Sequence, residues 1–232
     1  MALALEQEQP KVIAAIPAYN EEKFIAEVVK SALQYVDEVI VVDDGSTDRT
    51  AEVAEHAGAL VVRHKVNKRY GGAIKTCFQI ARKMDSEVLV TIDGDGQHDA
   101  SDIPLVLAPI QAGQADIVIG SRFMDNVNKV PLYRKFGINV ITFLCNIGNK
   151  VKVSDAQSGF RAYSWKAIQA IGDLKDQDMA ISVELLIKAH RKRLSIVEVP
   201  VSVKYHAESS TQNPIKHGLS VAFAAVQYRL NL

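Results

Sequence analysis

The stretch Val88-Leu89-Val90-Thr91-Ile92-Asp93-Gly94-Asp95-Gly96-Gln97-His98-Asp99 joins a strand-like apolar run to a group of charged and polar residues. The run ends in Asp93-Gly94-Asp95, so a buried strand is predicted to deliver two carboxylates at its carboxyl end. The glycines let the backbone turn sharply, and paired carboxylates suit a hard divalent cation and a phosphate-bearing ligand. Alone, an Asp-x-Asp is weak evidence, because short acidic pairs are common in solvated turns.

A second acidic turn supports this interpretation. Another apolar run, Val39-Ile40-Val41-Val42, ends in Asp43-Asp44-Gly45-Ser46. Two acidic strand ends in one α/β domain are expected at the same edge of a parallel sheet, which is where ligands bind in such domains. The two turns together predict a ligand site at that edge.

Composition narrows the class of protein. The 232 residues are 48% hydrophobic and 23% charged, which is typical of a globular protein with one large α/β domain or two small ones. Lys plus Arg and Asp plus Glu both number 27, so the chain offers no net field for bulk nucleic-acid binding and no nucleic-acid partner is expected. Cys77 and Cys145 lie in apolar stretches and are predicted to be buried free thiols in a reducing, cytoplasmic compartment.

The ends of the chain and its apolar stretches bear on localisation. Residues 1–10 are rich in Glu and Gln and lack a basic start, so they are expected to be a flexible N-terminus and not a signal peptide. The most apolar segments, residues 138–147 and 219–226, are shorter than the roughly 18 to 20 residues that a membrane span needs. The expected protein is therefore soluble, or peripheral on a membrane.

The first 92 residues alternate between apolar runs of strand length and segments with helical spacing. Asn20 is predicted to cap the first helix, and Ser46 or Thr47 the second, because such side chains accept hydrogen bonds from free helical N–H groups. This alternation is typical of a parallel sheet with helices on both faces. The expected strands are residues 11–17, 38–42, 59–62 and 87–92, and the expected helices are residues 21–33, 48–56 and 70–84.

The second half is less regular. Residues 123–135 are predicted to form a polar, basic loop that acts as a lid, and residues 195–203 an edge strand interrupted by Pro200. We predict one α/β domain over residues 11–212, with a mostly parallel central sheet and no second-domain boundary. The other expected elements are a strand at residues 116–119 and helices at residues 102–112, 136–150, 166–170, 181–190 and 213–232.

Six motifs occur in an order and at a spacing that together are specific. They are Ile16-Pro17-Ala18-Tyr19-Asn20-Glu21, Val42-Asp43-Asp44-Gly45-Ser46-Thr47-Asp48, Asp93-Gly94-Asp95-Gly96-Gln97-His98, Gly120-Ser121-Arg122, Asp155-Ala156-Gln157-Ser158-Gly159-Phe160-Arg161 and Ile196-Val197-Glu198-Val199-Pro200. On these motifs, residues 11 to about 210 resemble the inverting glycosyltransferases of family 2. Within that family the chain is most similar to dolichol-phosphate and polyprenyl-phosphate sugar synthases. The resemblance implies a GT-A fold with a Rossmann-like nucleotide-binding half.

The resemblance also implies a donor site. Pro17, Tyr19 and Glu21 correspond to the loop that packs on the nucleotide, and Asp44 to the carboxylate that reads the base. Asn20 and Glu21 also suit a helix cap, and both roles are compatible. His56, His64, His190 and His217 match no motif and are predicted at the surface.

The central acidic motif is the implied metal site. Asp93 would lie near the ribose and the donor phosphates, and Asp95 with Gln97 would hold Mg²⁺ or Mn²⁺ against the pyrophosphate. Few protein ligands are expected, because Mg²⁺ keeps waters and binds substrate oxygens. The cation would act as a Lewis acid on the departing nucleoside diphosphate. His98 is expected to support this motif and not to ligate the metal.

Arginines are the implied acceptor ligands. Arg122 and Arg134 correspond to residues near an acceptor phosphate, which guanidinium groups bind in bidentate fashion. Ser158 lies in the matching Ser-Gly-Phe-Arg turn, where Gly159 is expected to bring the backbone close to the reacting sugar. Arg161 has either a structural or a ligand-facing role, and a solvated basic turn is the alternative interpretation of Arg134. Glu198 is expected to pack or pair at a strand.

Two departures from relatives shape the expected reaction. Relatives that glycosylate a hydroxyl carry a Glu-Asp pair and a downstream Gln-x-x-Arg-Trp, and neither occurs here. A phosphate acceptor explains this, because it is already anionic near neutral pH and needs no general base. Many synthases also have membrane-spanning helices after this domain. Here the expected helix over residues 213–232 would instead pack on the domain, form a homo-oligomer or lie on a membrane surface.

The predicted function is transfer of a sugar from GDP-mannose or a UDP-hexose to polyprenyl or dolichyl phosphate, at the cytoplasmic face of the membrane. One alternative is a hydroxyl acceptor, for which Asp155 is the candidate general base. A non-catalytic nucleotide-sugar-binding subunit of a membrane complex is a further alternative. Intact Asp93, Asp95 and Gln97 and both arginines argue against a non-catalytic protein.

Overall fold

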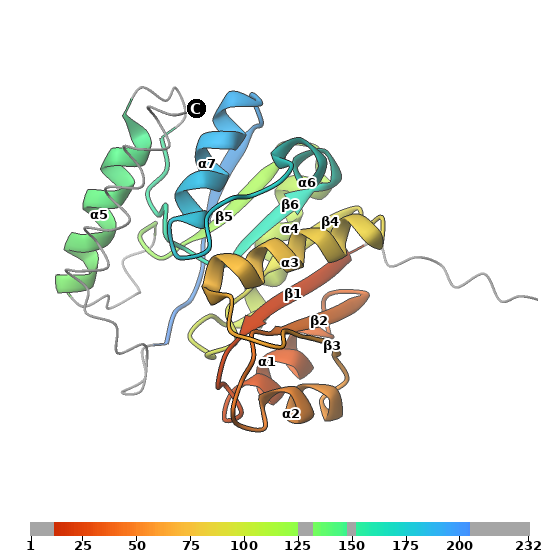
Figure 1. Cartoon of the computed structure of the whole chain (residues 1–232). Coiled ribbons are helices and arrows are strands. Elements are labelled where there is room, and N and C mark those ends of the chain that lie inside the picture. Colours follow the sequence, from red (N-terminus) through yellow and green to blue (C-terminus); the bar gives the residue numbers. More distant parts are fainter. Residues whose placement is uncertain (1–11, 125–131, 148–151, 205–232) are drawn as a thin grey trace, which may run out of the picture.

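A computed structural model describes residues 12–124, 132–147 and 152–204 of the chain. Its centre is a seven-stranded sheet with the order β3-β2-β1-β4-β6-β5-β7 (Figure 1). The strands are β1 (Val12–Ala18), β2 (Glu38–Asp43), β3 (Leu60–Arg63), β4 (Val88–Thr91), β5 (Ile117–Ser121), β6 (Arg161–Ser164) and β7 (Ile196–Pro200). β6 runs antiparallel to its neighbours β4 and β5, and the other pairings are parallel. The prediction of a mostly parallel sheet is confirmed.

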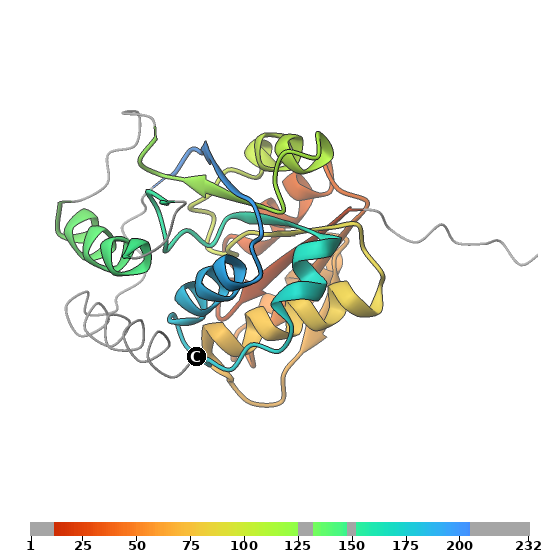
Figure 2. The same cartoon turned by 90° about the horizontal axis from the view of Figure 1, so that it is seen from above.

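Helices cover both faces of this sheet (Figures 1 and 2). One face carries α3 (Arg69–Lys83), α6 (Trp165–Ile171) and α7 (Ile181–Arg191), and the other carries α1 (Ile25–Ala32), α2 (Thr50–His56) and α4 (Ile103–Gln111). A short 3-10 helix, η1 (Ala100–Asp102), precedes α4. The remaining helix, α5 (Leu132–Asn146), lies at the flank of the molecule beside α7 (Figure 1).

The central strands are apolar on both sides because each side faces a separate core. In β1, Ile13 and Ala15 belong to the cluster under α3, α6 and α7, whereas Ala14 and Ile16 belong to the cluster under α1, α2 and α4. Successive side chains of a strand point to opposite faces, so a continuous apolar run fills both cores at once. This explains why the sequences of the central strands are unbroken apolar runs.

The capping predictions at the start of the chain are wrong. Asn20 is not the N-cap of α1, which begins after Phe24; Asn20 instead adopts a left-handed φ of +58°. Its side-chain oxygen accepts a hydrogen bond from the Thr47 N–H at 2.9 Å. The N-cap of α2 is Arg49, and neither Ser46 nor Thr47 takes that position. These polar side chains join two loops instead of capping helices.

Two differences occur in the second half. The four-residue strand β6 was not predicted, because it is short and begins with a charged residue, Arg161. The loop predicted over residues 123–135 is partly helix, since α5 begins at Leu132 and includes Arg134 and Lys135. A proline such as Pro131 is as common just before a helix as in a loop, so the sequence signal was ambiguous.

Several other expectations have a direct outcome. β7 is an edge strand, as predicted, but it ends at Pro200 and does not continue to residue 203. Cys77 and Cys145 are buried and unbridged, as predicted. Within the residues that the structure describes, every helix is too short or too polar to cross a membrane. The N-terminus over residues 1–10 and the helix predicted over residues 213–232 lie outside the described part.

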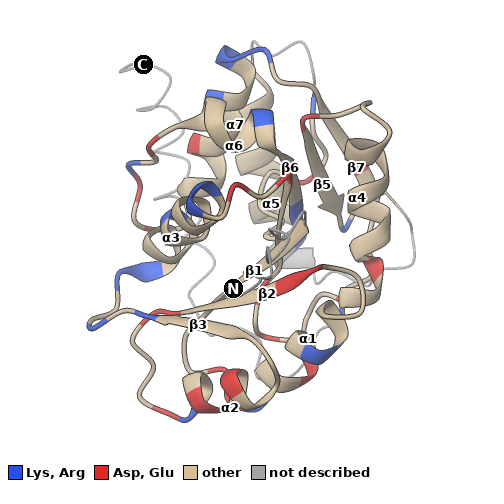
Figure 3. Ribbon diagram, turned by 90° about the vertical axis from the view of Figure 1, so that its right-hand side faces the viewer, with Lys and Arg blue, Asp and Glu red and all other residues tan. Residues whose placement is uncertain are grey.

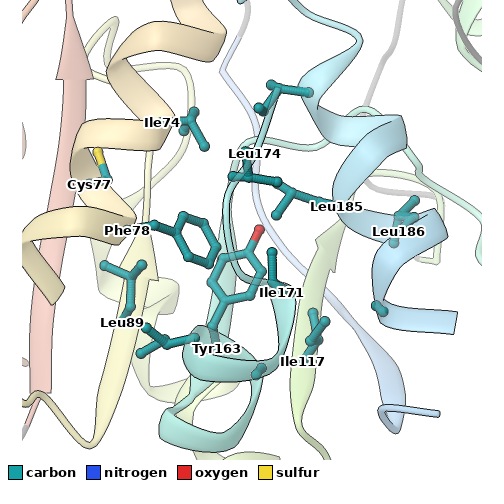
Figure 4. Packing of buried hydrophobic residues seen from close by; sticks show 14 of the residues in the cluster. Ile74, Cys77, Phe78, Leu89, Ile117, Tyr163, Ile171, Leu174, Leu185 and Leu186 are labelled. Atoms are coloured by element: carbon teal, nitrogen blue, oxygen red, sulfur yellow. The ribbon is translucent and has the colours of Figure 1, made fainter. Parts of the chain in front are cut away.

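The larger core is centred on an aromatic pair. Phe78 of α3 and Tyr163 of β6 are fully buried, with ring centroids 4.9 Å apart and planes at 67° (Figure 4). This edge-to-face geometry is the favoured arrangement for aromatic pairs. The pair fixes α3 against the antiparallel strand, and both elements contribute residues to the candidate site.

We expect Phe78→Ala to lower the free energy of unfolding by about 3 to 5 kcal/mol, because it removes a large buried ring and leaves a cavity. Urea unfolding measures this change. Val66→Ala is the control: Val66 is 67% exposed, and its truncation should change stability by less than about 0.5 kcal/mol. Similar losses for the two variants would contradict the assigned packing.

Candidate functional site

The acidic turns meet at one edge of the sheet, as predicted. β1 pairs in parallel with β2 on one side, with Ala18 opposite Asp43, and with β4 on the other, with Ala15 opposite Thr91. The segments that follow these three strands therefore leave the same edge, the carboxyl edge. Pro17 is buried near the end of β1, and Tyr19 is exposed just beyond it.

Hydrogen bonds join the loop after β1 to the loop after β2. The Asn20 N–H donates to Ser46 Oγ at 2.9 Å, and the Glu21 N–H donates to Thr50 Oγ1 at 2.7 Å. In the other direction, Asn20 Oδ1 accepts from the Thr47 N–H. The left-handed backbone at Asn20, which Asn tolerates better than most residues, makes this pairing possible. The loop that carries Tyr19 and Glu21 is thus fixed to the loop that carries Asp44.

Asp44 is held by groups that the sequence did not reveal. Its Oδ1 accepts from His64 Nδ1 at 2.6 Å and from the Lys68 N–H at 2.8 Å. His64 Nε2 in turn lies 2.8 Å from Thr76 Oγ1 on α3. The prediction that His64 lies at the surface is wrong, because its ring is buried between Asp44 and α3. One signal was present: His64 directly follows β3, so it emerges at the same carboxyl edge as the acidic turns.

Asp93 is partly buried at the centre of the site. The Tyr70 hydroxyl donates to Asp93 Oδ1 at 3.2 Å, and Thr91 Oγ1 donates to the Gly159 carbonyl at 2.9 Å. Gly159 is thereby held so close that a Cβ atom on it would lie 2.3 Å from Asp93 Oδ2. The sequence suggested that Gly159 brings backbone close to a sugar. In the structure the group next to Gly159 is the Asp93 carboxylate.

Asp95 and Gln97 are joined by hydrogen bonds. The Gln97 N–H donates to Asp95 Oδ1 at 3.0 Å, and the Gln97 side-chain amide donates to Asp95 Oδ2. Two donors thus orient one carboxylate at the turn after β4. Behind it, the buried His98 ring packs edge-to-face on Phe160, with centroids 5.4 Å apart. His98 therefore supports the turn, which agrees with the sequence-based expectation.

Like charges gather in this part of the site. Burial, followed by the negative charges of Asp95 and Asp93, raises the pKa of Glu21 to about 7. Burial and the charge of Asp95 also raise the pKa of Asp93 to about 7. A nearby cation would stabilise the ionised form of each of these carboxylates. Among the described residues, however, no group of three or more His, Cys, Asp or Glu side chains is arranged so that it could hold a metal ion.

Arg122 and Asp155 form a buried, bidentate ion pair. Arg122 Nε lies 2.6 Å from Asp155 Oδ2, and Nη2 lies 2.7 Å from Oδ1. Glu198 of β7 accepts from the Asp155 N–H at 3.0 Å and from the Ser154 N–H at 2.6 Å, so it supports the segment, as expected. Burial alone would raise the pKa of Asp155, but the Arg122 charge and hydrogen bonds outweigh it and hold that pKa below 3.8.

The remaining predicted residues have different surroundings. Ser158 is buried and its hydroxyl accepts from the Phe160 N–H at 3.3 Å. Arg161 is buried too, and its guanidinium donates to the carbonyls of Ser158 and Ala156 at 2.8 and 2.7 Å, so its role is structural. Arg134 belongs to α5, but its side chain lies outside the described residues. The structure therefore brings Glu21, Asp44, Asp93, Asp95 and Gln97 to one edge and does not test Arg134.

Comparison with known proteins gives a consistent result. Residues 13–172 match the sequence model described as "Glycosyl transferase family 2". A protein of Methanocaldococcus jannaschii described as uncharacterized is 35% identical over 233 residues, which cover 97% of this chain and 95% of that protein. The UDP-N-acetylglucosamine–dolichyl-phosphate N-acetylglucosaminyltransferase of Methanococcus voltae is 33% identical, over 82% of this chain and 84% of its own length.

A further relative and a solved structure extend the comparison. The dolichol-phosphate mannosyltransferase of Pyrococcus furiosus is 32% identical over 87% of this chain, which matches 59% of that protein. The glucosyl-3-phosphoglycerate synthase of Mycobacterium tuberculosis, in complex with Mn²⁺ and UDP-glucose, superimposes with a TM-score of 0.71. It is 22% identical, and the match covers 96% of this chain and 78% of that one. At this identity the likeness shows a shared fold.

We expect Asp155→Asn to destabilise the protein by about 3 kcal/mol at pH 7, because it leaves the Arg122 charge without its partner. The folded-state pKa of Asp155 is depressed, so the carboxylate contributes stability above about pH 4 and loses it as the pH falls through the lowered pKa. The difference in unfolding free energy between wild type and variant should therefore narrow below pH 4. Denaturant unfolding across pH 3 to 7 measures this difference, with a substitution of the exposed Asp173, Asp173→Asn, as control. A difference between wild type and Asp155→Asn that does not change with pH would contradict the ion pair.

Proposed function

Because the chain belongs to glycosyltransferase family 2, we propose that this enzyme transfers a hexose from a nucleotide-sugar, GDP-mannose or a UDP-hexose, to a polyprenyl or dolichyl phosphate. We place this reaction at the cytoplasmic face of a membrane. The named relatives support the acceptor class, since two of them are described by dolichyl or dolichol phosphate. The family and the GT-A fold that the motifs indicated are confirmed.

The observation that carries the proposal is the group of mutually repelling carboxylates Glu21, Asp93 and Asp95 at the carboxyl edge of the sheet. An edge that gathers three carboxylates next to a glycine-rich turn is suited to a cation that carries a diphosphate. We assign Asp95, supported by Gln97, as the metal ligand and Asp93 to the ribose and donor phosphates. Mg²⁺ or Mn²⁺ held there would offset the charge that develops on the departing nucleoside diphosphate.

The paired loops supply the proposed nucleoside site. Pro17, Tyr19 and Glu21 line one side, and Asp44 the other, with the two loops joined by the hydrogen bonds of Asn20 and Glu21. His64 and the Lys68 N–H both bind Asp44 Oδ1, so this carboxylate is oriented before a ligand arrives. Such pre-organisation lowers the entropy lost on binding. We propose that Asp44 accepts a hydrogen bond from the base.

The ion pair of Arg122 with Asp155 favours an anionic acceptor. Asp155 is the carboxylate that a hydroxyl acceptor would need as its base, and its lowered pKa makes it a weak base. Its two oxygens are also bound by the Arg122 guanidinium. We therefore assign Arg122, oriented by Asp155, to the acceptor phosphate, together with Arg134 and the turn at Ser158. A phosphate monoester needs no deprotonation by the protein.

The proposed step is a single in-line displacement. An acceptor phosphate oxygen forms a bond to the anomeric carbon while the bond from that carbon to the diphosphate oxygen breaks, so the configuration inverts. The protein contributes by aligning the two substrates and by stabilising charge at both ends of the reacting system. The donor-side carboxylates and the acceptor-side arginine serve these two ends.

Mass spectrometry of the lipid fraction tests the proposal. The protein is incubated with polyprenyl phosphate, Mn²⁺ or Mg²⁺ and a panel of GDP- and UDP-sugars, with Asp95→Ala as the inactive control. A glycosyl-phosphoryl-polyprenol is expected with wild type only. Nucleotide binding without any lipid product would overturn the acceptor assignment and favour a hydroxyl acceptor or a non-catalytic binding subunit.

We expect Gly159→Ala to lower turnover about 100-fold, because its Cβ would collide with the Asp93 carboxylate and displace it from its working position. Gly137→Ala is the matched control, since a Cβ there meets nothing within 4 Å and Ala favours the helix. Initial rates and thermal melting are measured for both variants. A Gly159→Ala variant that keeps full activity would refute the role given to Asp93.

A further inference from the structure

Helix α5 has an apolar stripe on its solvent-exposed side. Phe136 is 73% exposed, Val140 40%, Phe143 67% and Ile147, the residue after the helix, 47%. Their spacing of four, three and four residues places them within about 60° of one another on a helix that turns about 100° per residue. The stripe is therefore continuous along the whole described length of the helix.

The opposite side of α5 is also apolar, and it is buried. Ile141 and Cys145 belong to the core under α7, and Thr142 is buried beside them. A helix that is apolar on opposite sides is normally enclosed by protein or in contact with lipid. The described part of the chain does not cover the outer stripe, because α5 lies at the edge of the molecule (Figure 2). In the other residues that the structure describes, the exposed large apolar side chains do not form such a row along one helix.

The charge of this region suits an anionic surface. Residues 126–154 contain no Asp or Glu but five Lys or Arg, although the whole chain has 27 of each sign. Helices α1 and α7 carry side chains of both signs (Figure 3), but α3, like α5, carries Lys and Arg and no Asp or Glu. Lys135 and Lys152, at the two ends of the stripe, are exposed. Aromatic and aliphatic side chains flanked by basic residues are complementary to an anionic lipid surface.

We infer that the stripe of Phe136, Val140, Phe143 and Ile147, with Lys135 and Lys152, docks on an anionic phospholipid surface. A layer of phosphate headgroups would repel acidic side chains, and residues 126–154 contain none, which favours lipid as the occupant of the stripe. Two phenylalanines give an interfacial anchor, and the lysines add attraction that salt weakens.

The helix is rigidly connected to the proposed acceptor site. The Asn146 side-chain amide donates to the Val153 carbonyl at 2.7 Å and accepts from the Val153 N–H at 2.9 Å. Thr142 Oγ1 accepts from the Ala156 N–H at 3.1 Å. Asp155, which lies in the sequence between Val153 and Ala156, binds Arg122. Docking of α5 would therefore hold Arg122 at a fixed position relative to the lipid surface. This consequence rests on the proposed function, but the docking itself does not.

Flotation with vesicles tests the inference without turnover. The full chain is mixed with phosphatidylglycerol vesicles or with phosphatidylcholine vesicles of the same size. Wild type should partition at least about tenfold more strongly onto the anionic vesicles. F136S/F143S should lower that partition coefficient at least about tenfold, and K135E/K152E by a similar factor that salt reduces. The control is V66S/L105S, which removes two apolar side chains that are 67% and 47% exposed elsewhere, and should bind like wild type.

The outcomes separate docking from folding and from catalysis. Thermal melting and nucleotide binding should be the same for F136S/F143S as for wild type, because the changed side chains lie outside the core and the donor site. Unchanged flotation of F136S/F143S would overturn the inference. So would a wild-type dimer that this variant converts to monomer, since a second copy would then be the occupant of the stripe. If the protein binds vesicles but forms no lipid-linked product in the mass-spectrometry assay, docking is supported and only the proposed acceptor is overturned.

Discussion

Repulsion between Glu21, Asp93 and Asp95 is the constraint on which the arrangement of the site depends. Burial and mutual charge bring the pKa of Glu21 and of Asp93 to about 7, so the fold holds carboxylates where they are not fully ionised on their own. Such a cluster persists only if neighbouring structure fixes it. Here Tyr70 binds Asp93, Gly159 leaves room for it, and Gln97 orients Asp95. The charges suit the proposed cation, and the packing keeps the carboxylates together.

The antiparallel strand β6 gives the site its second half. It lies between β4 and β5, so the turn before it meets the acids after β4 on one side and Arg122 after β5 on the other. Arg161 binds two carbonyls of that turn, and Asp155 at its start binds Arg122. The residues that we assign to the donor and to the acceptor are therefore connected through one short segment. Its conformation affects both.

The sequence predicted the parallel half of the fold well because both cores require apolar runs in the central strands, and such runs are easy to recognise. The carboxyl ends of neighbouring parallel strands lie at one edge of a sheet, so the two acidic turns were predicted to meet there. The structure confirms this position. β6 and the pairing of Asn20 with Thr47 were missed, since both depend on contacts between distant segments and not on local pattern. His64 was missed for the same reason: nothing near it in sequence shows that Asp44 is its partner.

Helix α3 contacts both halves of the proposed donor site. Tyr70 near its start binds Asp93, Thr76 in its middle contacts His64, and Phe78 packs on Tyr163 of β6. Local unfolding of α3 would therefore remove the supports of Asp93 and Asp44 in one event. Ligand binding and the local stability of this helix must then be linked, because a ligand that requires both carboxylates binds only when α3 is in place. A bound donor should slow amide hydrogen exchange along the whole of α3, including turns that the donor never touches.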